Sequence, residues 1–238
     1  MSENDKTLIY LHIPKTGGQT LKATIKRNYP KDKTWRFHKD GKTAELIRKA
    51  DQYICLIGHR NFGIHRYLNK PYTYITMLRD PIDRVISIYY YLLRSPGHNL
   101  YDKVKDISFE DFVLDDKFRR QTENLQTLFI SGKSSKELSI AKHNLKNYFS
   151  VVGIMERFDE SLFLMSQEFG WKNINYKKKN VTKNRPAKED FSEKIIDKLK
   201  EKNELDIELY EYGKELFEEK LKTLPESTKQ KMNDYLQR

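Results

Sequence analysis

A lysine and two glycines lie close together near the amino end of the chain, in "HIPKTGGQTL" at residues 12–21. Gly17 and Gly18 would let the backbone approach a ligand closely, and the threonines on either side carry hydroxyl donors. Lys15 precedes both glycines, so its ammonium group could reach over a bound anion. Because backbone N–H groups at the start of a helix attract phosphate, these residues predict a phosphate-binding turn.

The residue order of this turn differs from that of a nucleoside triphosphatase. In the common P-loop, G-x-x-x-x-G-K-[ST], the lysine follows the glycines and the next hydroxyl helps to hold Mg²⁺. Here Lys15 comes before the glycines, and Gln19 follows them. A P-loop-type kinase is therefore a disfavoured hypothesis, and ATP turnover that depends on Mg²⁺ would revive it.

A second group of polar residues lies in "YITMLRDPIDRVISIYYY", about sixty residues farther along the chain. Arg79 ends a predicted strand, and Ser87 follows eight residues later in a helix that Asp80 is suited to cap. A guanidinium group can bind a phosphate through two hydrogen bonds, and a hydroxyl can add one more. The structural alternative is that Arg79 pairs with Asp83 and that Ser87 faces a neighbour in its helix.

These two segments in this order resemble the nucleotide-binding motifs of sulfotransferases that use 3′-phosphoadenosine 5′-phosphosulfate (PAPS). The resemblance is closer to the carbohydrate branch that contains the heparan sulfate 2-O- and 6-O-sulfotransferases and their bacterial relatives. It covers most of the chain, because it continues through "TENLQTLFISG" (122–132), "VVGIMERFDESLFLM" (151–165), "NVTKNRP" (180–186) and "ELDIELYEYGKELF" (204–217).

The resemblance implies a role for each part of the two motifs. The 5′-phosphosulfate would bind to Lys15, Thr16, Gly17, Gly18, Gln19 and Thr20. Lys15 would also stabilise charge on the bridging oxygen as the sulfuryl group leaves, while Arg79 and Ser87 would bind the 3′-phosphate. A loop that closes over the nucleotide would contain Asn180, Thr182 and Arg185. Sulfuryl transfer in this family needs no metal, and no Cys/His spacing here predicts a zinc site.

Two histidines are candidates for the general base that removes the acceptor's proton. His59 and His65 lie in "GHRNFGIH", directly after a predicted strand. A histidine suits this task because it titrates near neutral pH. By the resemblance, His59 fits the 2-O-sulfotransferase pattern and is our first choice, while His65 fits the 6-O pattern. A structural role stays open for both, and His12 is expected to pack beneath the phosphate turn.

The elements that would position these residues alternate between strands and helices. Short β-branched and aromatic runs predict strands at 7–13, 53–57, 72–78 and 148–154. Apolar spacing predicts helices at 18–28, 82–95, 108–114, 120–130, 135–147, 156–170 and 190–224, the last broken near Asn203. This order predicts an α/β fold with a P-loop-like central parallel sheet, flanking helices and a helical C-terminal region. We expect residues 1–238 to form a single sulfotransferase-like domain.

The charge balance limits the class of partner. The formal net charge is +11, from 45 Lys and Arg against 34 Asp and Glu. Such an excess favours an anionic partner, or it only keeps the surface soluble. A nucleic-acid-binding protein is the alternative function, and its affinity would fall steeply with salt. The basic residues are dispersed except in "YKKKN" at 176–180, so we expect no nucleic acid to bind.

Composition also bears on the setting of the protein. Cys55 is the single cysteine, so no disulfide can form within the chain. The start "MSENDKT" lacks the apolar core of a signal peptide, and no segment approaches the ~20 apolar residues of a membrane span. We therefore expect a cytoplasmic protein without a transmembrane segment. Because Golgi members of the family that it resembles carry a membrane anchor and disulfides, the resemblance implies a bacterial enzyme. The resemblance implies a hydroxyl-bearing acceptor, which would be a glycan or a glycolipid. Loops at 31–44 and 95–107 would border the acceptor-binding cleft. The sequence carries no signal for an oligomeric state.

Overall fold

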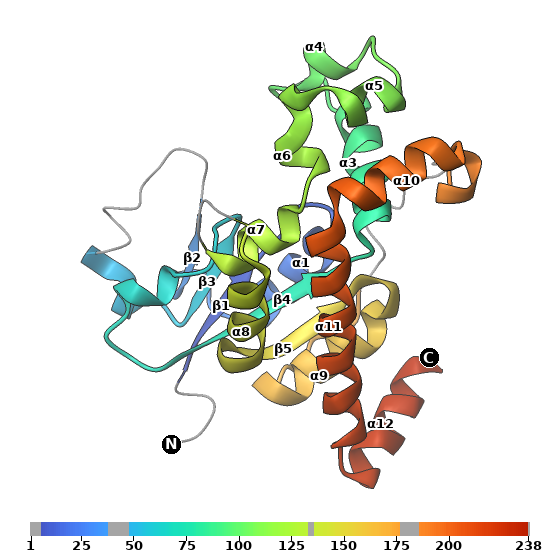
Figure 1. The fold of residues 1–238 in the computed structure, drawn as a ribbon. Helices are drawn as coiled ribbons and strands as arrows, with labels where there is room; N and C mark the ends of the chain where they lie inside the picture. The colour runs from blue at the N-terminus through green and yellow to red at the C-terminus, as the bar shows by residue number, and fades with distance from the viewer. Residues whose placement is uncertain (1–5, 38–47, 133–135, 177–185, 238) are drawn as a thin grey trace.

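A five-stranded parallel sheet lies at the centre of the computed structural model, which describes residues 6–37, 48–132, 136–176 and 186–237 (Figure 1). The strand order is β2-β3-β1-β4-β5, and each neighbouring pair runs parallel. The strands are β1 (Thr7–Leu11), β2 (Thr34–Arg36), β3 (Cys55–Gly58), β4 (Tyr72–Leu78) and β5 (Phe149–Ile154). The predicted α/β fold with a parallel sheet is confirmed.

Helices cover both faces of this sheet. On one face, Gly213 of α11 (Glu204–Lys222) lies so close to Leu78 that a Cβ there would be 2.5 Å from Leu78 Cδ1. On the other face, Gly153 leaves room for Met165 of α9 (Phe158–Phe169). Figure 1 shows α7 (Leu125–Ser131) and α8 (Leu138–Tyr148) on the side of α11, and α1 (Gly18–Asn28) behind the sheet. The carboxyl ends of the strands are therefore framed by helices on two sides.

A second, helical part of the molecule has its own apolar core. It comprises α3 (Pro81–Leu93), α4 (Tyr101–Val104), α5 (Phe109–Leu114), α6 (Arg119–Thr122) and α10 (Glu193–Lys202), which Figure 1 shows above the sheet. Buried side chains such as Val85, Phe112 and Leu199 form this cluster, apart from the cluster around the sheet. Because α3 starts just after β4 and extends into the helical part, it joins the sheet edge to the second core.

The junctions between helices depend on buried polar side chains. The predicted helix at 120–130 is interrupted at Asn124, which adopts a left-handed conformation with φ 45° and separates α6 from α7. The Asn124 side-chain oxygen accepts from the Asp206 N–H, and Asn203 Oδ1 accepts from the Asn124 N–H. Asn203 also ends α10, so the predicted break near this residue is confirmed.

Other boundaries differ from the sequence-based prediction by a few residues. The first strand ends at Leu11 instead of residue 13, because His12 begins the turn that leads to α1. The segments expected to be loops contain β2 and α4, which are too short for a periodic pattern to reveal. A last helix, α12 (Glu226–Leu236), follows the predicted C-terminal helical region. Within the described residues, no helix is both long and apolar enough to cross a bilayer.

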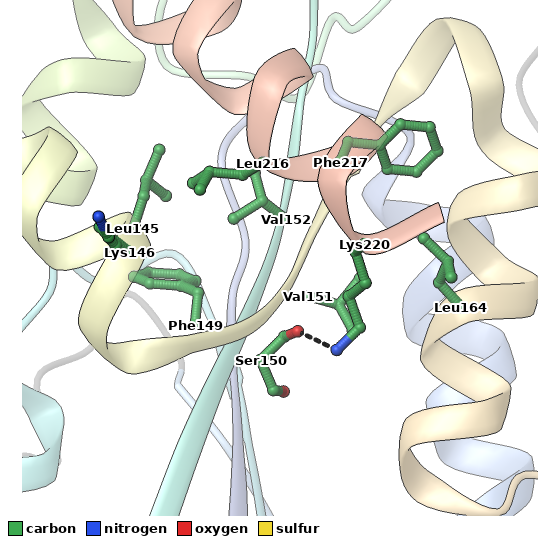
Figure 2. A pocket seen from close by; sticks show the side chains of 10 residues that line it. All are labelled: Leu145, Lys146, Phe149, Ser150, Val151, Val152, Leu164, Leu216, Phe217 and Lys220. Carbon is green, nitrogen blue, oxygen red and sulfur yellow. Dashed lines mark hydrogen bonds between the residues drawn. The ribbon is translucent and has the colours of Figure 1, made fainter. Parts of the chain in front are cut away.

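A small cavity lies beside the amino half of β5, between this strand and α8, α9 and α11 (Figure 2). Its volume is about 100 Å³, and apolar side chains such as Phe149 and Phe217 line it. Lys220 reaches across it and donates to the carbonyl oxygen of Ser150 and to Glu168, both at 2.7 Å. Since Phe149 and Ser150 begin β5, the cavity lies away from the carboxyl ends of the strands.

Candidate functional site

The turn between β1 and α1 folds around a left-handed backbone. Lys15 and Gly17 both have positive φ angles, of 71° and 77°. The hydroxyl of Thr16 is fully buried and donates to the carbonyl oxygen of Ile13 at 2.9 Å, which closes the turn. Gly17 then caps α1, and its carbonyl oxygen accepts from the N–H of Thr20. This geometry presents the first N–H groups of a helix at the end of β1, as an anion site requires.

Packing requires both glycines, and the positive φ of Gly17 favours glycine there as well. A Cβ at Gly17 would lie 2.3 Å from the sulfur of Met155, which packs against the turn. A Cβ at Gly18 would lie only 1.6 Å from Nε2 of His12. Sequence reasoning attributed both glycines to close approach by a ligand. The structure shows that Gly18 makes room for the buried ring of His12.

Arg79 connects the end of β4 to this turn. Its Nη1 donates to the carbonyl oxygen of Lys15 at 3.0 Å. Its own backbone is held by the side-chain amide of Gln126, which accepts from the Arg79 N–H at 3.0 Å and donates to the Arg79 carbonyl at 2.8 Å. The predicted phosphate-binding arginine is therefore fixed to the predicted phosphate-binding turn, although 64 residues separate Lys15 from Arg79.

Helix α3 brings two further side chains to the turn. Asp80 caps it, because its carboxylate accepts from the Asp83 N–H at 2.9 Å. Ser87 is almost buried on this helix, and Tyr91 lies one turn later on the same face. The ammonium group of Lys15 lies 4.2 Å from the centroid of the Tyr91 ring. The face of α3 that carries Ser87 and Tyr91 therefore points toward the phosphate turn.

His59 lies at the same edge, directly after β3. Its Nδ1 is 2.7 Å from the carbonyl oxygen of His12. A carbonyl oxygen only accepts, so Nδ1 carries the hydrogen and Nε2 is the unprotonated nitrogen of the neutral ring. The rings of His12 and His59 contact each other with centroids 4.1 Å apart. His59 as a whole is exposed, in contrast to the buried His12.

His65 lies elsewhere on the sheet. It belongs to a short 3-10 turn, η3 (Ile64–Tyr67), and its Nδ1 is 3.0 Å from the hydroxyl oxygen of Tyr74. Its ring stacks on Tyr72, with centroids 4.7 Å apart, and on Tyr148. Burial, with the nearby charge of Arg66, lowers the pKa of His65. Because Tyr72 begins β4, His65 lies near the amino end of this strand, whereas the phosphate turn lies at the carboxyl ends.

The structure thus brings one group of predicted residues together and leaves others apart. The group at the carboxyl edge consists of Lys15, Thr16, Gly17, Gly18, Gln19, Thr20, His59, Arg79 and Ser87. His65 packs at the opposite end of β4. The predicted loop residues Asn180, Thr182 and Arg185 lie outside the described residues.

Sequence reasoning assigned no role to several residues that support this group. Gln126 holds the backbone of Arg79, and Glu156 accepts from the Asp80 N–H and from the hydroxyl of Tyr210. Burial, and to a smaller extent the carboxylate of Glu156, raises the pKa of Tyr210. Gln126 and Glu156 both lie within segments that carried the family resemblance, which was the available signal. Tyr91, for which the sequence indicated a place in the core or a cleft wall, contacts Lys15 through its ring.

Comparison with known proteins decides the family. The profile of the sulfotransferase family matches residues 1–213. The chain belongs to the sulfotransferase family. Human heparan-sulfate 6-O-sulfotransferase 3 is 24% identical over 275 residues, covering 90% of this chain and 58% of that protein. Human heparan sulfate 2-O-sulfotransferase 1 is 25% identical over 199 residues, covering 68% of this chain and 54% of that protein.

A third relative is similar to this chain over a shorter alignment. Heparan sulfate 2-O-sulfotransferase 1 of Cricetulus griseus is 30% identical over 128 residues, covering 48% of this chain and 35% of that protein. This sulfotransferase-family chain spans between a third and three fifths of the length of these relatives. The family resemblance inferred from the two motifs is confirmed.

Proposed function

We propose that this member of the sulfotransferase family transfers the sulfuryl group of PAPS to a hydroxyl group of a carbohydrate, on a glycan or glycolipid. One observation carries the proposal: the imidazole of His59 is held at 2.7 Å by the carbonyl oxygen of His12, the residue that leads into the phosphate turn. A candidate base and a candidate anion site therefore adjoin each other. The relatives support a carbohydrate acceptor, since they are named as heparan sulfate sulfotransferases.

In the proposed reaction, one bond to sulfur forms as another breaks. The acceptor oxygen bonds to sulfur, and the bond between sulfur and the bridging oxygen of the 5′-phosphate breaks. Nε2 of His59 takes the hydroxyl proton, a role typically worth about 10²- to 10⁴-fold in rate. The ammonium group of Lys15 stabilises the negative charge that develops on the bridging oxygen. The products are a sulfate ester and adenosine 3′,5′-bisphosphate.

The remaining predicted residues would bind the nucleotide. The first turn of α1, with Gln19 and Thr20, would bind the 5′-phosphosulfate through backbone N–H groups. Arg79 and Ser87 would bind the 3′-phosphate; this proposal is supported by the contact of Arg79 with the turn and by the position of Ser87 on α3. The closing loop with Asn180, Thr182 and Arg185 stays a prediction, as do a bacterial source and a cytoplasmic location.

Ligand selectivity tests the nucleotide part of the proposal. Thermal-shift titration of the protein should show a clear preference for adenosine 3′,5′-bisphosphate over AMP, because only the former carries the 3′-phosphate. Arg79→Ala should reduce this preference, whereas Lys15→Ala should reduce turnover more than bisphosphate binding. Equal affinity of the unaltered protein for both nucleotides would contradict the proposal.

Turnover tests the chemical part. Mass spectrometry should detect a sulfate ester when candidate glycans are incubated with the protein and PAPS. His59→Ala should abolish most of this product, while His65→Ala should retain it, because His65 lies at the amino end of β4. Loss of product in the His65 variant alone would assign the base to His65 instead. Transfer to small phenols but to no glycan would overturn the carbohydrate assignment.

A further inference from the structure

The ring of His12 fills the space between the phosphate turn and the candidate base. On one side, a Cβ added at Gly18 would lie only 1.6 Å from its Nε2, so the ring packs directly on the start of α1. On another side, its ring contacts that of His59 with centroids 4.1 Å apart. Tyr10 stacks on it as well, at 5.3 Å and an angle of 17°. His12 is only 5% exposed, so this position is enclosed.

The backbone of His12 contacts the same neighbour. Its carbonyl oxygen accepts from Nδ1–H of His59, and its N–H donates to the carbonyl oxygen of Gly58 at 3.0 Å. The residue thus holds His59 at two points: the backbone fixes which nitrogen carries the hydrogen, and the ring limits how the imidazole can tilt. A base positioned in this way meets the acceptor with a defined nitrogen and a defined direction.

The charge state of His12 suits a residue that positions the candidate base. Burial lowers its pKa well below the ordinary value, and the charges of His59, Lys22 and Lys15 act in the same direction. The ring therefore stays neutral when His59 takes up a proton. A neutral aromatic face beside a protonated imidazole is favourable, whereas a second positive charge there would oppose proton transfer.

We infer that His12 is a positioning residue whose neutral ring holds His59 against the phosphate turn with Nε2 directed to the acceptor. This inference rests on the proposed function, because it assigns His12 a role through the proposed base. The backbone contact survives any substitution at this position, so the inference concerns the ring. Displacement of a reacting group by about 1 Å can cost about a hundredfold in rate, which makes the effect measurable.

Two substitutions of similar size distinguish the effect of a ring at position 12 from the effect of merely filling the space. His12→Phe keeps a flat uncharged ring, and His12→Leu fills the space without one. We expect the Phe variant to retain kcat within about threefold and the Leu variant to lose about tenfold or more. The affinity for adenosine 3′,5′-bisphosphate, measured by calorimetry, should change by less than about threefold in both. Equal kcat in the two variants, or a parallel loss of bisphosphate affinity, would overturn the inference.

A double-mutant cycle tests whether His12 acts through His59. In the His59→Ala background, His12→Leu should cause no further loss of kcat, since the group that it positions is gone. A further loss of the same size as in the unaltered protein would show an independent, structural effect and would refute the inference.

A measurement without turnover keeps the inference testable whatever the substrate. Long-range ¹H–¹⁵N spectra of the histidine side chains should show His59 as the Nδ1–H tautomer in the unaltered protein and in His12→Phe. His12→Leu should give an exchange-broadened His59 signal, because the ring that limits the tilt of the imidazole is absent, although the backbone carbonyl still fixes the tautomer. Unchanged His59 signals in His12→Leu would overturn the inference even in an active enzyme, while failure to form any sulfate ester would count only against the proposed function.

Discussion

The ammonium group of Lys15 lies 4.2 Å from the ring centroid of Tyr91, so the phosphate turn and α3 meet through a cation–π contact. Tyr91 is 40% exposed, which places its ring at the border between the turn and solvent. A lysine side chain has four rotatable carbon–carbon bonds, and a ring beneath its end limits where the ammonium group can lie. Tyr91 thus restrains the lysine that we propose for sulfuryl transfer.

We predict that Tyr91→Ala lowers kcat by about two- to fivefold, the equivalent of the ~0.5–1 kcal/mol that such exposed contacts contribute. Tyr91→Phe should stay within about twofold of the unaltered protein, because the ring face is retained. Steady-state turnover of PAPS checks both values. A Phe variant as slow as the Ala variant would instead point to the hydroxyl group.

Gln126 provides the second prediction, since its side-chain amide makes two hydrogen bonds to the backbone of Arg79. Gln126→Leu leaves this N–H and carbonyl without their partner, which costs about 1–3 kcal/mol and loosens the end of β4. We expect the affinity for adenosine 3′,5′-bisphosphate to fall about tenfold, with little change for AMP, because Arg79 would bind the 3′-phosphate. Gln167→Leu, at an exposed position on α9, is the matched control. An equal loss for both nucleotides would argue against this role of Arg79.

Gly18 provides a prediction about stability. Gly18→Ala forces a Cβ against the ring of His12 and should lower the free energy of unfolding by about 1–3 kcal/mol. The cost should largely disappear in a His12→Ser background, where the ring is absent. Gly97→Ala is the control, because a Cβ there would meet no heavy atom of the described residues within 4 Å. Urea unfolding measures all four variants, and an undiminished cost with Ser at position 12 would contradict the packing argument.

The buried His12 and the half-buried His65 predict how stability depends on pH. Burial lowers the pKa of His12 and of His65 below the ordinary value of 6.5, and nearby positive charges add to the effect. Below pH 6.5 these two side chains therefore bind more protons in the unfolded chain than in the folded protein. The stability that these neutral rings contribute is present above this pH and is lost as the pH falls, by up to about 1.4 kcal/mol per pH unit for the buried His12 and by less for the partly exposed His65, whose charge solvent screens.

Urea unfolding between about pH 7.5 and pH 5 checks this direction. His12→Phe and His65→Phe should each make the dependence shallower, because Phe does not titrate. His143→Gln, at an exposed position, should leave the slope unchanged. A slope in the His65 variant equal to that of the unaltered protein would show that His65 does not contribute.

The parts of the fold that followed from sequence are those specified locally. The strand at 72–78 and the helix at 18–28 have the predicted bounds, because a dense β-branched run and regular apolar spacing define them. The break near Asn203 also followed from local pattern. By contrast, β2 has only three residues, and its strand conformation depends on pairing with β3. Asn124 interrupts a helical pattern because Asn203 and Asp206, about 80 residues later, bind its polar groups.

The sequence by itself determined the family, and it predicted a phosphate-binding role for the turn after β1 and for Arg79 at the end of β4, since these depend on residue types at short, ordered spacings. Only the tertiary structure decided that His59 adjoins this turn while His65 packs on Tyr72 at the other end of β4. The two histidines are six residues apart, but the chain between them runs along the sheet, so sequence distance does not define their position. The same holds for the proposed role of His12: Gly18 meets it within the turn after β1, and His59 reaches it because β1 and β3 pair in parallel.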